Sequence, residues 1–168
     1  MNAQLKESTP MIHIENIHIH LPTSQQIDAV ILPFGRTDEK KPAQRFELST
    51  DGSYVHDHKL GLIWSAAESE KEYNFADAEK YASECRIGGW NDWRQPEEHE
   101  LQSLRDLSRY NPCIDVSVFK SNAGYVWTKT PYAANTSFAF AVYFGGGGVS
   151  GYGRDGKCFV RPVRVARQ

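Results

Sequence analysis

The fold of this chain depends on one short stretch, G-G-W-N-D-W-R-Q-P-E at residues 88–97. The paired glycines Gly88 and Gly89 predict the end of a helix, because glycine adopts the positive φ that closes a helix without steric cost. Pro96 predicts the beginning of the next helix, since proline suits the first helical position. The acids that follow, Glu97, Glu98 and Glu100, support this start, because negative side chains interact favourably with the positive N-terminal end of a helix. The stretch is therefore expected to be a turn between two helices.

Both predicted helices carry apolar residues at helical spacing. The first begins after Asn74, which is a good N-cap, and one of its faces carries Phe75, Ala78, Ala82 and Cys85. In the second helix the stripe expected to be buried is Leu101, Leu104 and Leu107.

Short strands are predicted on both sides of the helices. Asp51-Gly52, a dipeptide suited to a tight hairpin turn, separates the apolar runs 45–48 and 53–56. A third short strand is expected at residues 61–64, and the chain after Pro112 reads as strand and loop, ending in the run 159–165. Two helices between β segments predict an α+β domain over residues 43–168.

The first 42 residues form a separate region. Residues 11–21 and 27–34 read as extended chain, and the charged, breaker-rich run 35–42 reads as a linker. We therefore predict a β-rich N-terminal arm and linker over residues 1–42. An arm of two strands is marginal alone, so we expect it to pair with other chains, with a trimer favoured.

The charge and composition of the chain do not predict binding to nucleic acid or to a membrane. The 168 residues carry a formal net charge of -2, with 24% charged and 40% hydrophobic residues, which is ordinary for a soluble globular chain. Acids outnumber bases ten to four over residues 66–100, and five bases stand against Asp155 from Arg154 onward. We expect a solvated helical face and a solvated basic tail, with no nucleic-acid partner and no membrane insertion.

Cysteine usage and the N terminus predict the compartment. Cys85, Cys113 and Cys158 are odd in number and form no CxxC pair, so we expect reduced thiols and no structural zinc. Residues 1–10 lack the apolar core of a secretory signal. We therefore expect a protein made in the cytoplasm without a signal peptide.

Several ordered motifs together resemble the Lcl C-terminal domain family. They are G-L-I-W at 61–64, the stretch at 88–97, E-L-Q-S-L at 100–104, N-P-C-I-D at 111–115, Y-V-W-T-K-T at 125–130 and C-F-V-R-P-V-R at 158–164. The resemblance covers about residues 46–165 and not the arm. It implies a C-type-lectin-like fold: two helices, antiparallel β-sheets and a long loop-rich second half. The departures are Gln95 for a usual leucine, Trp90 for a tyrosine and Cys113 for a small residue.

The residues of these motifs are interpreted as structural. Asp92 and Arg94 lie on the turn between the helices, where a carboxylate can accept from free backbone N–H groups and a guanidinium can pair with it. Large aromatic anchors of a small core are expected at Trp64, Trp93 and Trp127.

Patterns that would indicate catalysis or a cofactor are each incomplete in this sequence. G-G-G-V-S-G at 146–151 matches G-x-G-x-x-G, but more glycines follow instead of a helix. His99-Glu100 lacks the second histidine of a zinc protease, because Ser103 stands in its place. Trp90-Asn91-Asp92 echoes a calcium-binding tripeptide of sugar-binding lectins, yet it lies between the helices instead of in a late strand. Formylglycine-generating chemistry needs paired late cysteines, and only Cys158 lies there. We predict no catalytic residue and no cofactor.

Two histidine pairs leave one metal alternative open. His18 and His20 face one side of an extended chain, as do His56 and His58. Around a threefold axis one such pair per chain gives six nitrogen ligands, which suits a transition metal. We favour solvated strand histidines and predict no metal.

The second half of the chain concentrates residues typical of binding faces. Tyrosine and asparagine on glycine-rich loops supply contact area at low entropic cost. We predict ligand contacts at Tyr132, Asn135, Tyr143, Tyr152, Arg154, Asp155 and Lys157.

The function predicted is ligand recognition without catalysis. Since a phage protein leaves its host by lysis and needs no signal peptide, we favour a tail or fibre-tip protein of the virion, with a host-surface protein or glycan as partner. An intracellular interaction or inhibitor protein is the alternative. A bacterial surface adhesin and a formylglycine-generating-type enzyme are ranked below both.

Overall fold

The first β-sheet is built from both ends of the domain. The computed structural model describes residues 44–167. In it β1 (Phe46–Leu48), β2 (Tyr54–Asp57), β3 (Leu62–Ser65) and β7 (Val163–Val165) pair antiparallel in the order β1-β2-β3-β7. The predicted hairpin is confirmed, with Gly52 at φ 71° in the turn between β1 and β2. The last strand, β7, thus closes the sheet beside the third.

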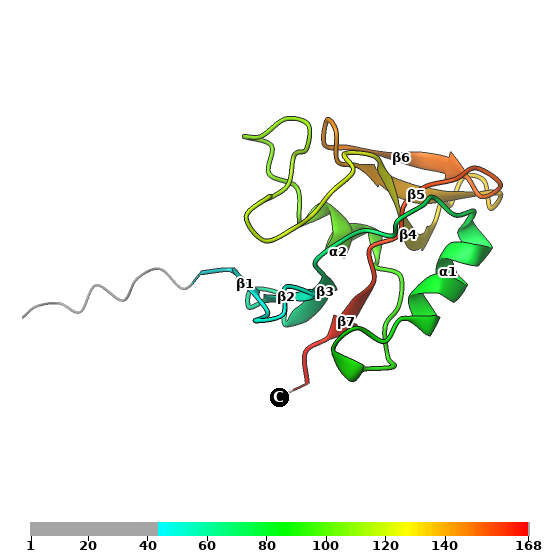
Figure 1. Ribbon diagram of the computed structural model, residues 1–168. Coiled ribbons are helices and arrows are strands. Elements are labelled where there is room, and N and C mark those ends of the chain that lie inside the picture. The colour runs from blue at the N-terminus through cyan, green and yellow to red at the C-terminus, as the bar shows by residue number, and fades with distance from the viewer. Residues whose placement is uncertain (1–43, 168) are drawn as a thin grey trace, which may run out of the picture. The chain divides into compact units, whose positions relative to one another are not determined.

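The second sheet comes from the second half of the chain. β4 (Tyr125–Pro131), β5 (Phe138–Tyr143) and β6 (Gly148–Gly153) form antiparallel pairs in chain order. Figure 1 shows this sheet apart from the first one, with β6 as its outer strand and α1 close to one side. Two antiparallel sheets and two helices confirm the predicted α+β class.

The first helix follows its predicted N-cap. α1 (Phe75–Glu84) begins after Asn74, whose side chain accepts from the Asp77 N–H at 2.9 Å. Ala78 and Ala82 are fully buried on its inner face. The predicted end at Gly88-Gly89 is wrong: the helix ends four residues earlier, where Cys85 is already extended. Instead, the two glycines form a separate 3-10 turn, η1 (Ile87–Gly89), at φ 62° and 75°.

The second helix is shorter than its apolar stripe suggested. α2 (Glu98–Gln102) is held by a capping box between Glu97 and Glu100. Leu101 and Leu104 are buried, as predicted, whereas Leu107 is 72% exposed. The prediction for Leu107 is wrong because the helix ends before the spacing of one helical face can reach it.

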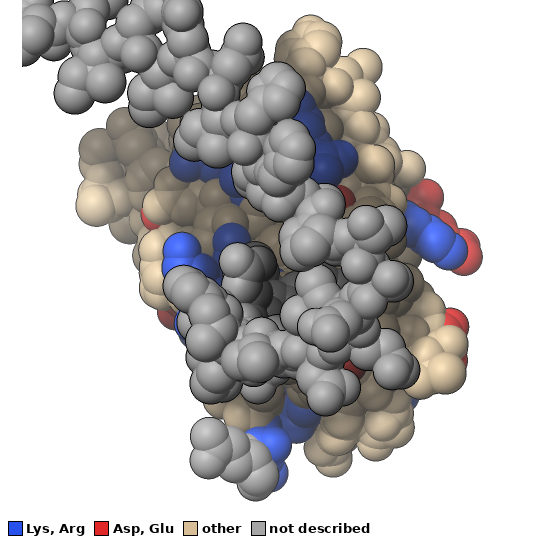
Figure 2. All heavy atoms as spheres, turned by 90° about the vertical axis from the view of Figure 1, so that its left-hand side faces the viewer, with Lys and Arg blue, Asp and Glu red and all other residues tan. Residues whose placement is uncertain are grey.

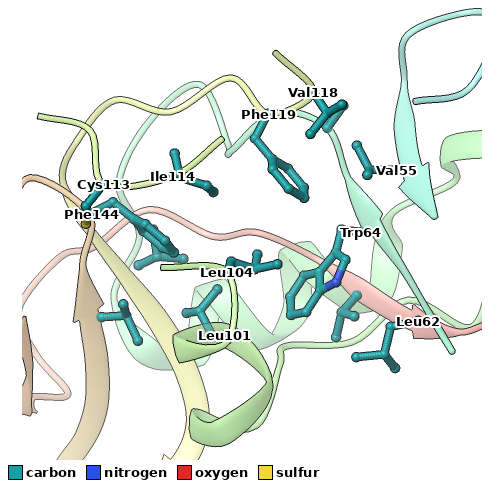
Figure 3. Packing of buried hydrophobic residues seen from close by; sticks show 14 residues of the cluster. Val55, Leu62, Trp64, Leu101, Leu104, Cys113, Ile114, Val118, Phe119 and Phe144 are labelled. Atoms are coloured by element: carbon teal, nitrogen blue, oxygen red, sulfur yellow. The ribbon is translucent and has the colours of Figure 1, made fainter. Parts of the chain in front are cut away.

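Two apolar clusters form the core. The larger one contains Trp64, Leu62, Leu101 and residues of the long loop after α2, and Trp64 lies beside Leu104 in it (Figure 3). Trp127 joins the smaller cluster, which packs β4 and β5 against α1. Trp64 and Trp127 are fully buried and Trp93 is 3% exposed, so the three predicted anchors are confirmed as core residues.

Basic residues near the C terminus are not all solvated. Arg161 and Arg164, counted in the predicted basic tail, are 0% and 4% exposed, so that expectation is wrong for them. On the uncovered part of the face in Figure 2, lysine and arginine side chains stand at separate places, some of them beside acidic side chains. The predicted arm, its linker, and His18 and His20 lie outside the described residues.

Candidate ligand-binding surface

The predicted ligand residues fall into two groups: five lie on loops at one end of the second sheet, and Tyr143 and Tyr152 lie on one of its faces. Phe138 pairs with Gly153 at one end, and Tyr143 pairs with Gly148 at the other. Tyr143 is therefore separated from the loop residues with which it was grouped. The structure brings together five of the seven predicted residues at the first end and places Tyr143 and Tyr152 on one sheet face.

The first group lies where the β4–β5 loop meets the turn after β6. The Arg154 backbone N–H donates to the Ser137 carbonyl at 2.9 Å, which holds the two segments together. A shallow depression here is lined by Ser137, Phe138, Gly153, Arg154 and Asp155. The exposed predicted residues of these two segments are Tyr132, Asn135, Asp155 and Lys157, of which Asp155 lines the depression.

Arg154 differs from the other members of this group. Its guanidinium lies 4.4 Å from the centre of the Phe75 ring, a cation–π distance. Its Nε is buried and has no hydrogen-bond partner among residues 44–167. The side chain therefore lies against the start of α1 and is only partly available to a ligand.

The second group is a row of tyrosines on the sheet face that also packs against α1. Tyr125 is the register partner of Tyr143, and their rings stack with centroids 4.7 Å apart. Tyr152 follows at 5.3 Å from Tyr125. Tyr143 is 37% exposed and the other two are half-buried. Within the described part of the chain the three phenol hydroxyls make no hydrogen bond, and none of them is among the fully buried polar atoms that lack a partner.

The tyrosine row (Tyr125, Tyr143, Tyr152) rests on a rigid base. The Trp127 ring meets Tyr152 edge-on at 5.7 Å, and its indole N–H donates to the Tyr73 carbonyl at 2.8 Å. The Tyr143 ring lies against Gly145, which leaves no room there for a Cβ. Tyr125 belongs to the tyrosine-rich second half in which the sequence predicts contact residues, and the pairing of β4 with β5 places it beside Tyr143.

The motif turn is held by ion pairs that differ from the predicted ones. Asp92 does not pair with Arg94; it accepts from Arg164 at 2.7 and 3.2 Å, and Arg167 lies 3.3 Å away. Arg94 instead donates to both carboxylate oxygens of Glu100, each at 2.8 Å. The prediction of a local pair is wrong because the better partner comes from β7, which closes beside the turn.

A hollow beside Asp92 is lined by charged and aromatic groups. His56, Asn91, Arg164 and Arg167 surround it, together with Trp90. The Arg164 guanidinium lies 4.2 Å from the Trp90 ring centre, and its hydrogen bond holds the pKa of Asp92 below the usual range. Because Arg164 already contacts both the Trp90 ring and the Asp92 carboxylate, we interpret these side chains as holding the fold together.

One polar side chain in the turn has no visible partner. Gln95 is 2% exposed, and neither its amide oxygen nor its amide nitrogen is hydrogen-bonded within residues 44–167. A buried amide without partners costs free energy. At this position the family resemblance implies leucine, and this chain instead buries a polar side chain there.

Other groups that could carry chemistry are dispersed. In the described part of the chain no three His, Cys, Asp or Glu side chains gather as metal ligands. His56 and His58 stack at 6.0 Å, and His58 lies 2.8 Å from Glu47. The three cysteines are unpaired, and burial raises the pKa of Cys158 to about 12. Residues 146–151 form a turn and β6, a structure unlike a dinucleotide loop.

The structure is an α+β domain with two antiparallel sheets. The ion pairs of the motif turn lie beside the first sheet, and the tyrosine row lies on the second. The Lcl C-terminal domain family matches residues 53–164, and the chain belongs to that family. The family predicted from the motifs is thereby confirmed. No curated protein matches the chain. Within residues 44–167, no helix has the length and apolarity to cross a bilayer.

Proposed function

We propose that this protein recognises a ligand without catalysing a reaction, through the β4–β5–β6 sheet and its loops. The observation that carries the proposal is the tyrosine row on a sheet face, whose three hydroxyls have no hydrogen-bond partner among residues 44–167. Tyrosine rings give contact area with few rotatable bonds, so little entropy is lost on binding. The exposed loop residues at the Tyr152 end of the sheet, Tyr132, Asn135, Asp155 and Lys157, extend the surface.

The finer fold assignment is part of the proposal. We infer a C-type-lectin-like domain, because the chain closes its first sheet with its last strand and assigns its second half to a separate, loop-rich sheet. The family resemblance supports the same inference. In such a domain the second half forms the ligand face, which agrees with the position of the tyrosine row.

The biological setting follows by analogy with the family. We propose a phage tail or fibre-tip protein that contacts a protein or glycan of the host cell surface. Residues 1–42 would join copies of the chain, with a trimer favoured. Light scattering should then find a trimer for the full chain and a monomer for a chain beginning at Gln44. A full-length monomer at about micromolar concentration contradicts this part.

An interaction or inhibitor protein is the second candidate function. The long loop between α2 and β4 exposes Leu107, Tyr110 and Val116 at 72%, 84% and 56%. Exposed apolar side chains on one loop favour a protein partner. Loss of binding on changing this loop, with the tyrosine row intact, would select this candidate.

The main experiment removes the hydroxyls and keeps the rings. A triple variant, Tyr125→Phe, Tyr143→Phe and Tyr152→Phe, should bind its ligand about tenfold more weakly or worse, since each lost hydrogen bond costs about 0.5–1.5 kcal/mol. Binding is measured on arrays of glycans and host-surface proteins. Tyr81→Phe on α1 is the matched control. Unchanged binding by the triple variant would reject the tyrosine row as the site.

A further inference from the structure

Within residues 44–167, one edge of the second sheet is paired with further chain and the other edge is not. Along β4, Phe159 pairs with the strand: its N–H donates to Tyr125 O at 2.8 Å, and Trp127 N–H donates to Phe159 O at 3.0 Å. Along β6, no second strand pairs within residues 44–167, and Figure 1 shows β6 at the outside of the sheet.

The register identifies the backbone groups that face outward from β6. Arg154 N–H donates to Ser137 O, so the hydrogen-bonded partners of β5 are the even-numbered residues Gly148, Ser150 and Tyr152. The N–H and C=O groups of Val149, Gly151 and Gly153 point away. Since Gly156 N–H donates to Gly153 O at 2.9 Å, three N–H and two C=O groups remain without a partner in the described part of the chain.

This edge lacks the features that normally protect an exposed strand. Natural edge strands are kept short or carry charges or proline, because open backbone groups attract other chains. β6 spans six residues, G-V-S-G-Y-G, with neither charge nor proline. β1, the edge of the other sheet, has only three residues and includes Glu47. The contrast marks β6 as an edge adapted to pairing.

We propose that β6 docks an extended, uncharged polypeptide segment of the recognised partner as a fourth strand of the sheet. This proposal rests on the proposed recognition function and names its ligand class as protein. A polypeptide supplies N–H and C=O groups at the spacing that the β6 edge requires, which a glycan does not. Segments that add to a sheet edge in this way gain affinity from the main chain and specificity from alternating side chains.

The surroundings of the edge define the side chains that fit. On one face, the docked segment meets Ser150 and Tyr152. On the other it meets Val149 and the Tyr132 ring, which lies against Gly151. Neither β5 nor β6 contains a charged residue. Between Val149 and Tyr152, a charged side chain of the segment would lose water without an ionic partner on β5 or β6, so apolar or hydroxyl side chains are expected at alternate positions there.

The test uses the full chain and a display library of linear peptides about twelve residues long, enough to span β6. Val149→Pro removes one outward N–H and leaves the bonds to β5, because that N–H faces away from β5. Val149→Thr keeps the N–H and the branched shape. We expect selected peptides to be uncharged, to bind wild type and Val149→Thr alike, and to bind Val149→Pro about tenfold more weakly. N-methylation of alternate peptide residues should abolish binding.

Several outcomes would overturn the inference. No enrichment of peptides, or equal binding to Val149→Pro, removes β6 as the docking strand. A dimer of the full chain that Val149→Pro dissociates makes a second copy the occupant instead. If Val149→Pro does not fold, Ser150→Lys decides, since it adds a charge beside the edge and should weaken peptide binding equally. Glycan binding that needs the tyrosine row leaves the proposed function standing and rejects only this inference.

Discussion

The two sheets differ in how far their polar side chains are bonded to each other. Around the first sheet, carboxylates pair with arginines: Glu68 with the fully buried Arg161, and Asp57 and Asp92 with the partly or nearly buried Arg45 and Arg164. On the second sheet β4 has one ion pair, between Lys129 and Glu97, whereas β5 and β6 carry no charge and the hydroxyls of the tyrosine row are unbonded within residues 44–167. Groups that bond to each other stabilise the fold, whereas groups left unbonded are available to a partner. Substitutions on the first sheet should therefore change stability, and substitutions on the second should change binding.

The largest effect is expected at Arg161. Its guanidinium is fully buried and donates to the carbonyls of Ser65, Ala66 and Lys120, as well as to Glu68 Oε1 at 3.1 Å. Burial lowers the pKa of Arg161, and the Glu68 carboxylate partly opposes this. Arg161→Met leaves a buried carboxylate without its charge partner and should lower the free energy of unfolding by about 3–5 kcal/mol. Chemical denaturation measures this.

Two further variants sharpen the result. Arg167→Met removes an arginine whose side chain is 78% exposed and should cost less than about 1 kcal/mol. Adding Glu68→Gln to Arg161→Met should recover part of the loss, because no buried charge then remains. Similar unfolding curves for Arg161→Met and Arg167→Met would contradict the structural role of the buried pair.

A smaller effect is expected at Asp92. Asp92→Ala deprives the nearly buried Arg164 of its carboxylate partner, which should cost about 1–3 kcal/mol and lower Tm by several degrees. Thermal unfolding and ligand binding are measured on the same samples. Unchanged melting together with lost binding would reassign Asp92 from the fold to the ligand site.

Features set by neighbouring residues were predictable from the sequence. The Asp51-Gly52 hairpin and the Asn74 cap each depend on a few consecutive residues. The start of α2 was placed two residues too early, at Pro96, because the N-cap is Glu97. The buried tryptophans were also predictable, because rings of that size seldom leave a small core.

Features set by distant pairing were not predictable. Asp92 and Arg164 are 72 residues apart, and only the return of β7 brings them together. Tyr125 joins the tyrosine row through the register of β4 with β5, which no local pattern encodes. The length of α2 was overestimated because a local pattern misled: Leu107 continues the helical spacing of Leu101 and Leu104, although the helix ends at Gln102.

A modest gain in stability is expected from Gln95→Leu. The amide is buried without a hydrogen-bond partner in the described part of the chain, and an apolar side chain of similar size removes that cost. We expect a gain of about 1 kcal/mol in the free energy of unfolding. Gln102→Leu is the control, because the Gln102 amide donates to Glu98 at 3.2 Å and its loss should not stabilise. Destabilisation by Gln95→Leu would show that the amide is satisfied by a group such as a bound water.

The smallest effect concerns pH and the pair of Arg94 with Glu100. Burial alone would raise the pKa of Glu100, but hydrogen bonds from Arg94 and the Glu97 N–H, with the Arg94 charge, hold it below its usual value near 4.5. A carboxylate whose folded pKa is depressed contributes stability above its unfolded pKa, and this contribution is lost as pH falls through the folded pKa. Unfolding free energy should therefore decline below about pH 4.5, and Glu100→Gln should make that decline shallower. Glu79→Gln, which removes the same charge from the exposed face of α1, is the matched control. Parallel pH curves for wild type and Glu100→Gln would show that this pair does not contribute to acid unfolding.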